Sequence, residues 1–306
     1  EIVKVENKDQ EREFVVFPFS LYKGCDYWVP PIISEELESM DKEKNPVFEN
    51  AEAEFYIAKK DGVTVGRIAA MVNWVEIEEQ KKNKLRFGWY DTIDDLEVSK
   101  KLLESVIEFG KKRKLEFVDG PVGFSNMDKA GLLIEGYEEL NTMITWYHYP
   151  YQKEHLKKLG FSKLAEWVEY KIKIFSAEDA PEKVKKFSKI IQQRYELKVL
   201  NFKSRKEIVP YVDKMFELLN VTYSNLQTYV TIKQYQIDFY KEKFIKYIHP
   251  DFIKCCLDKD DNLIAFLITM PSFSRALKKI NGKMGLMGYL RLFKAQHFND
   301  RVSLYL

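Results

Sequence analysis

Two carboxylates early in the chain have a spacing that suits proton transfer. Glu52 and Glu54 are two residues apart on a predicted strand. Side chains two apart on a strand point to the same face, so either carboxylate is a candidate general base for a substrate bound there. The alternative is that both belong to an ordinary solvated strand face.

A second group of polar residues lies in the glycine-bearing loop Gly120–Gly136. Long loops of this kind often carry function, and glycine permits close approach of the backbone. We expect Ser125, Asn126 and Asp128 to lie near a substrate-binding pocket. The alternative is that they satisfy backbone groups of their own loop, as Asx-type turns do.

The histidines give no comparable signal. His148 and His155 are seven residues apart, and no third ligand accompanies them, so the sequence predicts no zinc site. His249 and His297 have no metal-ligand spacing either. We identify no Ser/His/Asp set and no phosphate-binding P-loop in the sequence.

Composition indicates a folded chain of about two domains. It has 306 residues, of which 45% are hydrophobic, and the net charge is only +2. The charges are interspersed, so nucleic acid is not an expected partner. The longest apolar run, Leu263–Met270, has strand length, so no membrane partner is expected. Three cysteines are too few for a disulfide framework, which favours a cytoplasmic location.

The elements that must position these residues are readable in the first half. An Asp-Gly turn signal joins two apolar runs, and a long helix is capped by Asp94 or Asp95. The predicted strands are Ala53–Gly62, Val63–Asn73, Leu85–Tyr90 and Phe117–Pro121, and the helix is Leu96–Lys112.

The segment Tyr151–Phe161 reads as a short amphipathic helix stopped by Gly160, with a returning strand at Trp167–Ile174. Glycine supplies the left-handed conformation that ends a helix, and Phe161 can fold back onto the last turn. This segment resembles the closing helix and strand of the GNAT acyltransferase superfamily. The order of elements from Phe14 to Lys173 resembles a whole GNAT domain. The loop Gly120–Gly136, together with Trp28–Pro31 and Lys44–Glu54, resembles a little-described bacterial family with a GNAT domain.

A similar order begins again after the polar segment Ser176–Pro181. The resemblance therefore implies an α+β fold of two tandem GNAT-like domains, at residues 1–175 and 182–306, each with a mixed, mostly antiparallel sheet flanked by helices. We expect the second domain to stop after its fourth strand. Its predicted elements are helices at Val184–Gln193 and Ser204–Leu219 and strands at Leu197–Phe202, Phe252–Leu257, Leu263–Met270 and Arg301–Leu306.

The sequence departs from the superfamily where coenzyme A is held. GNAT enzymes carry a Q/R-x-x-G-x-G/A loop between the fourth strand and its helix, and backbone N–H groups there bind the pyrophosphate. The corresponding stretch, Asp91–Glu97, has no glycine and four carboxylates, which repel a polyphosphate. We expect the first domain not to bind coenzyme A in the usual way, and acetyl-CoA or another acyl-CoA to bind in the second.

A second departure concerns the general acid. Many GNAT enzymes place a tyrosine in the closing helix, where this chain has Leu156. Tyr147, Tyr149 and Tyr151 lie just upstream and could reach the same space, and we take Tyr147 and Tyr149 as the catalytic candidates. The alternative is that these tyrosines only pack, with their hydroxyls at the surface.

Two functions agree with these observations. The resemblance implies attack of a neutral amine on an acyl thioester, with a carboxylate or water accepting the amine proton. The first hypothesis is therefore an acyl-CoA-dependent N-acyltransferase that acts on a small-molecule amine or a peptide. The second is a non-catalytic protein that binds a peptide or metabolite in the cleft. A homodimer, formed through the exposed fourth strand, is a further hypothesis.

Overall fold

The computed structural model describes residues 1–125, 127–174, 176, 178–244 and 249–304. Asn126 lies outside the described residues. The chain divides into two compact units, and each is interrupted in sequence. The first comprises Glu1–Glu166, Gln227–Thr231 and Ser272–Asn299, and the second comprises Trp167–Leu226, Ile232–Pro271 and Asp300–Leu306. The domain boundaries expected from the sequence, 1–175 and 182–306, stay predictions.

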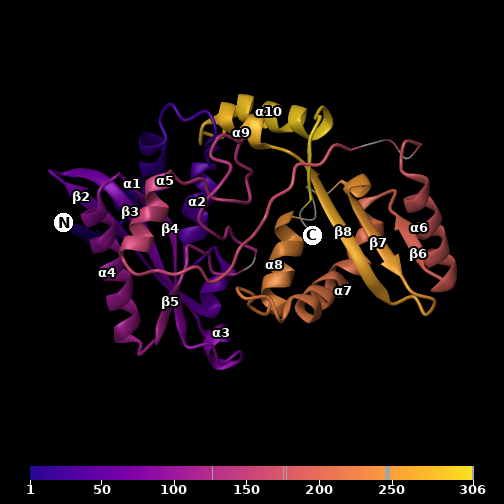
Figure 1. The fold of residues 1–306 in the computed structure, drawn as a ribbon, viewed down its shortest axis with the longest axis horizontal. Coiled ribbons are helices and arrows are strands. Elements are labelled where there is room, and N and C mark those ends of the chain that lie inside the picture. Colours follow the sequence, from indigo (N-terminus) through magenta and orange to yellow (C-terminus); the bar gives the residue numbers. More distant parts are fainter. Residues whose placement is uncertain (126, 175, 177, 245–248, 305–306) are drawn as a thin grey trace. The chain divides into compact units, whose positions relative to one another are not determined.

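The first unit is built on a five-stranded sheet whose strands follow in chain order (Figure 1). The first four strands are antiparallel, and the fifth is parallel to the fourth. The turn at Asp61-Gly62 has positive φ at both residues, which confirms the hairpin predicted there. The strands are β1 (Ile2–Lys4), β2 (Ala51–Lys60), β3 (Val63–Asn73), β4 (Lys84–Thr92) and β5 (Phe117–Asp119).

Helices cover both faces of this sheet because alternate residues of β3 point to opposite sides. Ile68 packs with Leu102 of α4, whereas Met71 packs with Phe14 of α1. The helices of this unit are α1 (Lys8–Leu21), α2 (Ile33–Met40), α3 (Trp74–Glu78), α4 (Leu96–Lys112), α5 (Pro150–Lys158), α9 (Ser274–Ile280) and α10 (Leu286–His297), with a 3₁₀ turn, η1 (Pro46–Glu49).

A buried arginine ties distant parts of the first unit together. Arg86 is 1% exposed and forms two hydrogen bonds with the Glu76 carboxylate, at 2.9 and 3.0 Å. It also donates to the carbonyl oxygens of Gly123 at 3.1 Å and Thr228 at 2.8 Å. The short segment Gln227–Thr231 therefore supplies one of the hydrogen-bond acceptors of the Arg86 guanidinium group on β4.

The second unit holds a four-stranded sheet that is antiparallel throughout its described strands. Its core packs Ile208 and Met215 of α7 against Ile253 and Cys255 of β7. The strands are β6 (Lys198–Asn201), β7 (Ile253–Leu257), β8 (Leu263–Pro271) and β9 (Val302–Leu304), and the helices are α6 (Glu182–Arg194), α7 (Arg205–Tyr223), α8 (Gln234–Phe244) and the 3₁₀ turn η3 (Pro250–Phe252).

The predicted α+β class with two helix-flanked sheets is confirmed. The helix Leu96–Lys112 has the predicted bounds, and Asp95 rather than Asp94 caps it. The predicted strand Trp167–Ile174 is wrong, because these residues pair with no strand and five of their large apolar side chains are exposed. Their alternating apolar pattern supplies strand propensity, but a strand also needs a partner.

Candidate functional site

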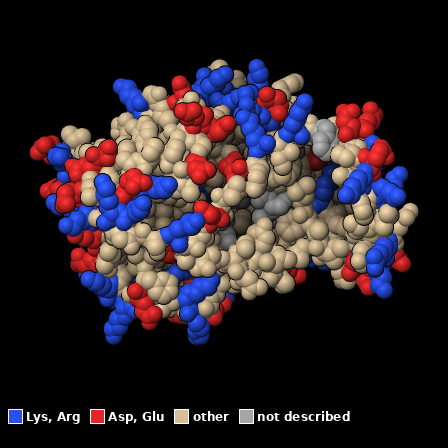
Figure 2. Space-filling view, in the orientation of Figure 1, with Lys and Arg blue, Asp and Glu red and all other residues tan. Residues whose placement is uncertain are grey.

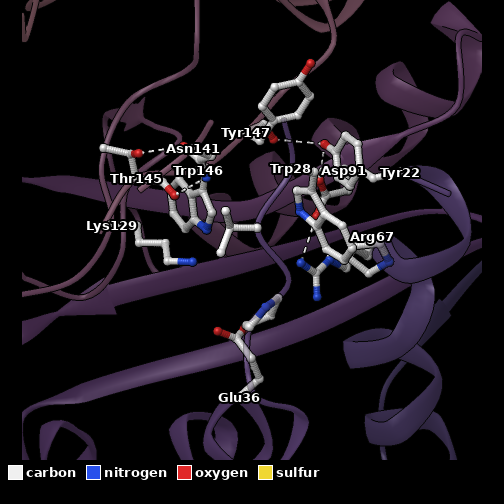
Figure 3. A pocket seen from close by; sticks show the side chains of 13 residues that line it. Tyr22, Trp28, Glu36, Arg67, Asp91, Lys129, Asn141, Thr145, Trp146 and Tyr147 are labelled. Atoms are coloured by element: carbon white, nitrogen blue, oxygen red, sulfur yellow. Dashed lines mark hydrogen bonds and ion pairs between the residues drawn. The ribbon is translucent and has the colours of Figure 1, made fainter. Parts of the chain in front are cut away.

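A small cavity of about 20 Å³ lies in the first unit, beside the last residues of β4. That volume is room for about one water molecule. Residues from α1, β3, β4 and the two loops at residues 129 and 141–147 line it (Figure 3). Its walls combine aromatic rings with charged groups, so it is a concave polar site in this unit.

The floor of the cavity is a buried ion pair with an aromatic partner. The register of β3 and β4 sets Arg67 opposite Asp91, and the Arg67 Nε and Nη2 atoms each lie 2.8 Å from Asp91 Oδ2. The Tyr22 hydroxyl donates to Asp91 Oδ1 at 2.7 Å, and burial raises the pKa of Tyr22 well above its usual value. Both carboxylate oxygens are thus engaged, so Asp91 positions its neighbours and is not a free base.

A lysine faces this pair across the cavity (Figure 3). The Lys129 ammonium group makes no hydrogen bond or ion pair with any described residue, and burial lowers its pKa. Glu36 also lines the cavity, but its Oε2 accepts a hydrogen bond from Trp89 Nε1 at 2.8 Å. An unpaired lysine in a polar cavity can bind an anionic group, or accept a proton once it is neutral.

Of the two tyrosines singled out as catalytic candidates, one lines the cavity and the other packs against residues that line it. Tyr147 lines the cavity and donates to the carbonyl oxygen of Tyr137 at 3.0 Å. Tyr149 packs against Tyr22 and Tyr147, with ring centroids 5.1 and 5.9 Å away, and its hydroxyl has no partner among the described residues. Burial raises the pKa of both hydroxyls, so both are protonated at neutral pH and can donate a proton.

The glutamates lie elsewhere on the sheet. Glu52 Oε2 is 2.7 Å from Arg113 Nη2, and Glu54 Oε1 is 2.9 Å from Lys4 Nζ. Burial alone would raise the pKa of Glu54, but the hydrogen bond from Tyr56 and the charge of Lys4 lower it. Neither carboxylate lines the cavity, and their role as bases stays a prediction.

The loop residues mostly contact one another. Asp128 Oδ2 accepts from the backbone N–H of Ser125 at 3.0 Å, and Ser125 Oγ accepts from that of Met127 at 3.2 Å. This is the backbone-satisfying arrangement that the sequence left open. Their neighbour Lys129 is the loop residue that enters the cavity, and only its place in a glycine-bearing loop could have indicated it.

The structure also brings together a serine, a histidine and an aspartate that the sequence analysis missed. Ser99 Oγ lies 2.8 Å from His155 Nδ1, and His155 Nε2 lies 3.1 Å from Asp94 Oδ1. Ser99 is fully buried and accepts a hydrogen bond from the Tyr90 hydroxyl at 2.8 Å, so no substrate can reach it. The set therefore joins α5 to α4 and is not a nucleophilic triad.

The turn before α4 does not fit the pyrophosphate of coenzyme A. Asp95 Oδ1 accepts from the backbone N–H of Glu97 at 3.0 Å, so a carboxylate already occupies the end of the helix where an anion would bind. Asp94, 69% exposed, adds a second negative charge beside it. No step of a reaction is assigned to coenzyme A at this turn.

The described residues contain neither a metal-binding cluster nor a membrane-spanning helix. No three or more His, Cys, Asp or Glu side chains among them are grouped so as to hold a metal ion. Within the same ranges, no helix is long and apolar enough to cross a bilayer.

Comparison with known proteins gives relatives at low identity. No protein-family model matches the chain. Protein YghO of Escherichia coli is 26% identical over 290 residues, which span 94% of this chain and 72% of that protein. The bacterial ceramide synthase of Caulobacter vibrioides is 23% identical over 172 residues, spanning 56% of this chain but only 44% of that protein.

Solved structures were compared as well. A GNAT-family acetyltransferase from Staphylococcus aureus covers 39% of this chain and 72% of its own, with 16% identity and a TM-score of 0.29. A tandem GNAT protein from the clavulanic acid biosynthesis pathway covers 88% of this chain and 73% of its own, with 10% identity and a TM-score of 0.42. These similar structures are GNAT proteins.

Proposed function

We propose that this protein is an N-acyltransferase that moves an acyl group from a thioester to an amine. The observation that carries the proposal is the pairing of the first sheet. Four antiparallel strands are followed by a parallel fifth, and β4 pairs with β5 only over Lys84–Arg86 and then continues to Thr92 paired with β3 but not with β5. In the superfamily that the sequence resembles, the cleft lies where these two strands separate.

The relatives support an amine as the acceptor. One of them is a bacterial ceramide synthase, and a ceramide contains an amide bond between an acyl chain and an amino alcohol. The acceptors to test are therefore small-molecule amines, including long-chain amino alcohols, and peptides. The donor is acetyl-CoA or another acyl-CoA, and we propose that its polyphosphate does not bind at the turn before α4, because the carboxylate of Asp95 caps that helix end.

Within the first unit we propose Tyr149 as a proton donor in this reaction. Its hydroxyl is protonated at neutral pH and has no partner among the described residues, so a substrate can accept its proton without breaking an existing hydrogen bond. Tyr147 is the second candidate. Glu52 and Glu54 remain the proposed bases, and Ser125 and Asp128 the proposed acceptor contacts.

The test is amide formation measured by mass spectrometry, with the purified chain, a series of acyl-CoA donors and a panel of amines. In Tyr149→Phe the rings still stack, so we expect kcat to fall about 100-fold with KM nearly unchanged. Tyr151→Phe is the matched control, because it removes a hydroxyl that donates to the Thr92 carbonyl at 2.7 Å. Full turnover by Tyr149→Phe would remove Tyr149 from the mechanism, and no product with any donor would overturn the enzyme proposal.

The acidic turn favours one alternative, a non-catalytic protein that binds a peptide or metabolite. Asp94 and Asp95 occupy the position where an acyl-CoA enzyme of this superfamily binds its donor. Calorimetric titration with acetyl-CoA and a long-chain acyl-CoA separates the two functions. Saturable binding supports the transferase, whereas metabolite or peptide binding without any acyl-CoA binding supports the alternative.

A further inference from the structure

The helix α10 presents apolar side chains to solvent. Five of its large residues, Leu286, Met287, Tyr289, Leu290 and Phe293, are between 53% and 79% exposed. A surface helix of a globular protein normally turns such residues toward the core. A contiguous exposed group of them marks an interaction surface.

The exposure follows from which side of α10 packs. Gly288 is buried, and Leu292, four residues later, joins a cluster with Val29, Ile32 and Leu277. Residues four apart lie on one side of a helix, so this side faces the first unit. At 3.6 residues per turn, Leu286, Leu290 and Phe293 lie on the opposite side. Their side chains are therefore available to another molecule.

The segment that contains this apolar face is rich in basic residues, one of which, Lys278, pairs with Asp26. The segment Ser272–Asn299, which contains α9 and α10, has six lysines and arginines and no aspartate or glutamate. Figure 2 shows blue side chains gathered at the top of the view, where Figure 1 places α9 and α10. The six are Arg275, Lys278, Lys279, Lys283, Arg291 and Lys294.

We propose that α10 docks on the surface of an anionic lipid bilayer, with Leu286, Leu290 and Phe293 inserted at the level of the headgroups. Leucine and aromatic side chains next to lysine and arginine are the composition of helices that lie in the membrane interface. Anionic headgroups complement a segment that carries six positive charges and no negative one. The sequence-based expectation of no membrane partner rested on the lack of a long apolar run, and a helix lying on the surface needs none.

The positive charge of this segment also argues against a second copy of this chain as the partner that binds α10. Two copies joined face to face through α10 would bring two segments of the same positive charge together, and like charges at close range disfavour association. The proposal goes beyond the acyl-transfer proposal and does not depend on it.

Vesicle flotation with the purified chain tests the proposal. We expect binding to vesicles of equal parts phosphatidylcholine and phosphatidylglycerol, little binding to phosphatidylcholine alone, and weaker binding as salt rises. The double variant Leu290→Ser with Phe293→Ser should lower the bound fraction at least about tenfold, because the lost apolar contact dominates insertion. Lys283→Glu with Lys294→Glu should remove the preference for anionic vesicles.

A control variant shows whether the loss of vesicle binding is specific to the apolar residues of α10. Tyr170 and Ile172 are 78% and 70% exposed and lie outside α10, so Tyr170→Ser with Ile172→Ser should bind vesicles like the wild type. All four changed apolar residues are exposed, so circular dichroism should show an unchanged fold. Absence of binding to anionic vesicles would overturn the proposal. So would equal loss in the control variant, or sedimentation showing a dimer that needs Phe293 while no lipid is bound.

Discussion

Removing Arg67 tests whether the ion pair between Arg67 and Asp91, at the floor of the cavity, stabilises the fold. In Arg67→Met, the Asp91 carboxylate loses both guanidinium contacts, at 2.8 Å each, and keeps only the Tyr22 hydroxyl. The side chains of Arg67 and Asp91 are 5% and 9% exposed, so the single water molecule for which the cavity has room solvates the remaining carboxylate only in part. Breaking one side of a buried pair costs about 3–5 kcal/mol, and we expect the free energy of unfolding to fall by that amount.

The double variant Arg67→Met with Asp91→Asn gives the sharper result. Neutralising the stranded carboxylate removes its desolvation cost, so the double variant should recover about half of the loss or more. Urea unfolding followed by tryptophan fluorescence measures both values. Lys112→Met is the control, because its pair with Glu108 is exposed and its loss should leave the free energy of unfolding nearly unchanged. If Asp91→Asn gave no recovery, the electrostatic account of this floor would be refuted.

Two further predictions concern titrating groups at the site. Burial lowers the pKa of His148 from 6.5 to about 4. Between pH 6.5 and 4 the unfolded chain therefore binds more protons than the folded chain. The free energy of unfolding that His148 contributes is complete above pH 6.5 and is lost as the pH falls toward 4. His148→Gln should abolish that contribution, roughly 3 kcal/mol, in urea titrations compared across this range. Burial likewise lowers the pKa of Lys129 below 10.5, which penalises the charged form in the folded state, so Lys129→Met should raise the free energy of unfolding at pH 7 by about 1 kcal/mol. That gain should shrink as the pH approaches 10.5, and a variant less stable than the wild type at pH 7 would contradict it.

Local signals carried most of what the sequence predicted correctly. The helix α4 is specified by its own residues, with a capping aspartate, an apolar stripe and two lysines in the last turn. Gly160, with a φ of +90°, follows α5 as expected. The strand predicted at Trp167–Ile174 failed because strand formation depends on a partner that the segment itself cannot specify.

The site was harder to predict because it depends on pairings between distant residues. Arg67 meets Asp91 through the register of two strands, and Ser99 meets His155 across 56 positions of the chain. Neither distance is visible as a spacing pattern. A superfamily resemblance pointed to the region of Tyr147 and Tyr149; Tyr147 lines the cavity, and the catalytic role of both tyrosines stays a prediction. The apolar face of α10 escaped notice because periodicity indicates a helix but not which of its sides is covered.

The contact between Arg86 and Thr228 has a consequence for the way the protein is made. Its two residues are 142 positions apart, so a ribosome has released all five strands of the first sheet long before the last acceptor for this guanidinium emerges. The α9 residue Leu277, which packs against Val29 and Ile32, arrives later still. The first unit therefore cannot complete its folding during synthesis in the usual order from the N-terminus. A nascent chain must keep an unfinished sheet in a folding-competent state until most of the second unit has also been synthesised.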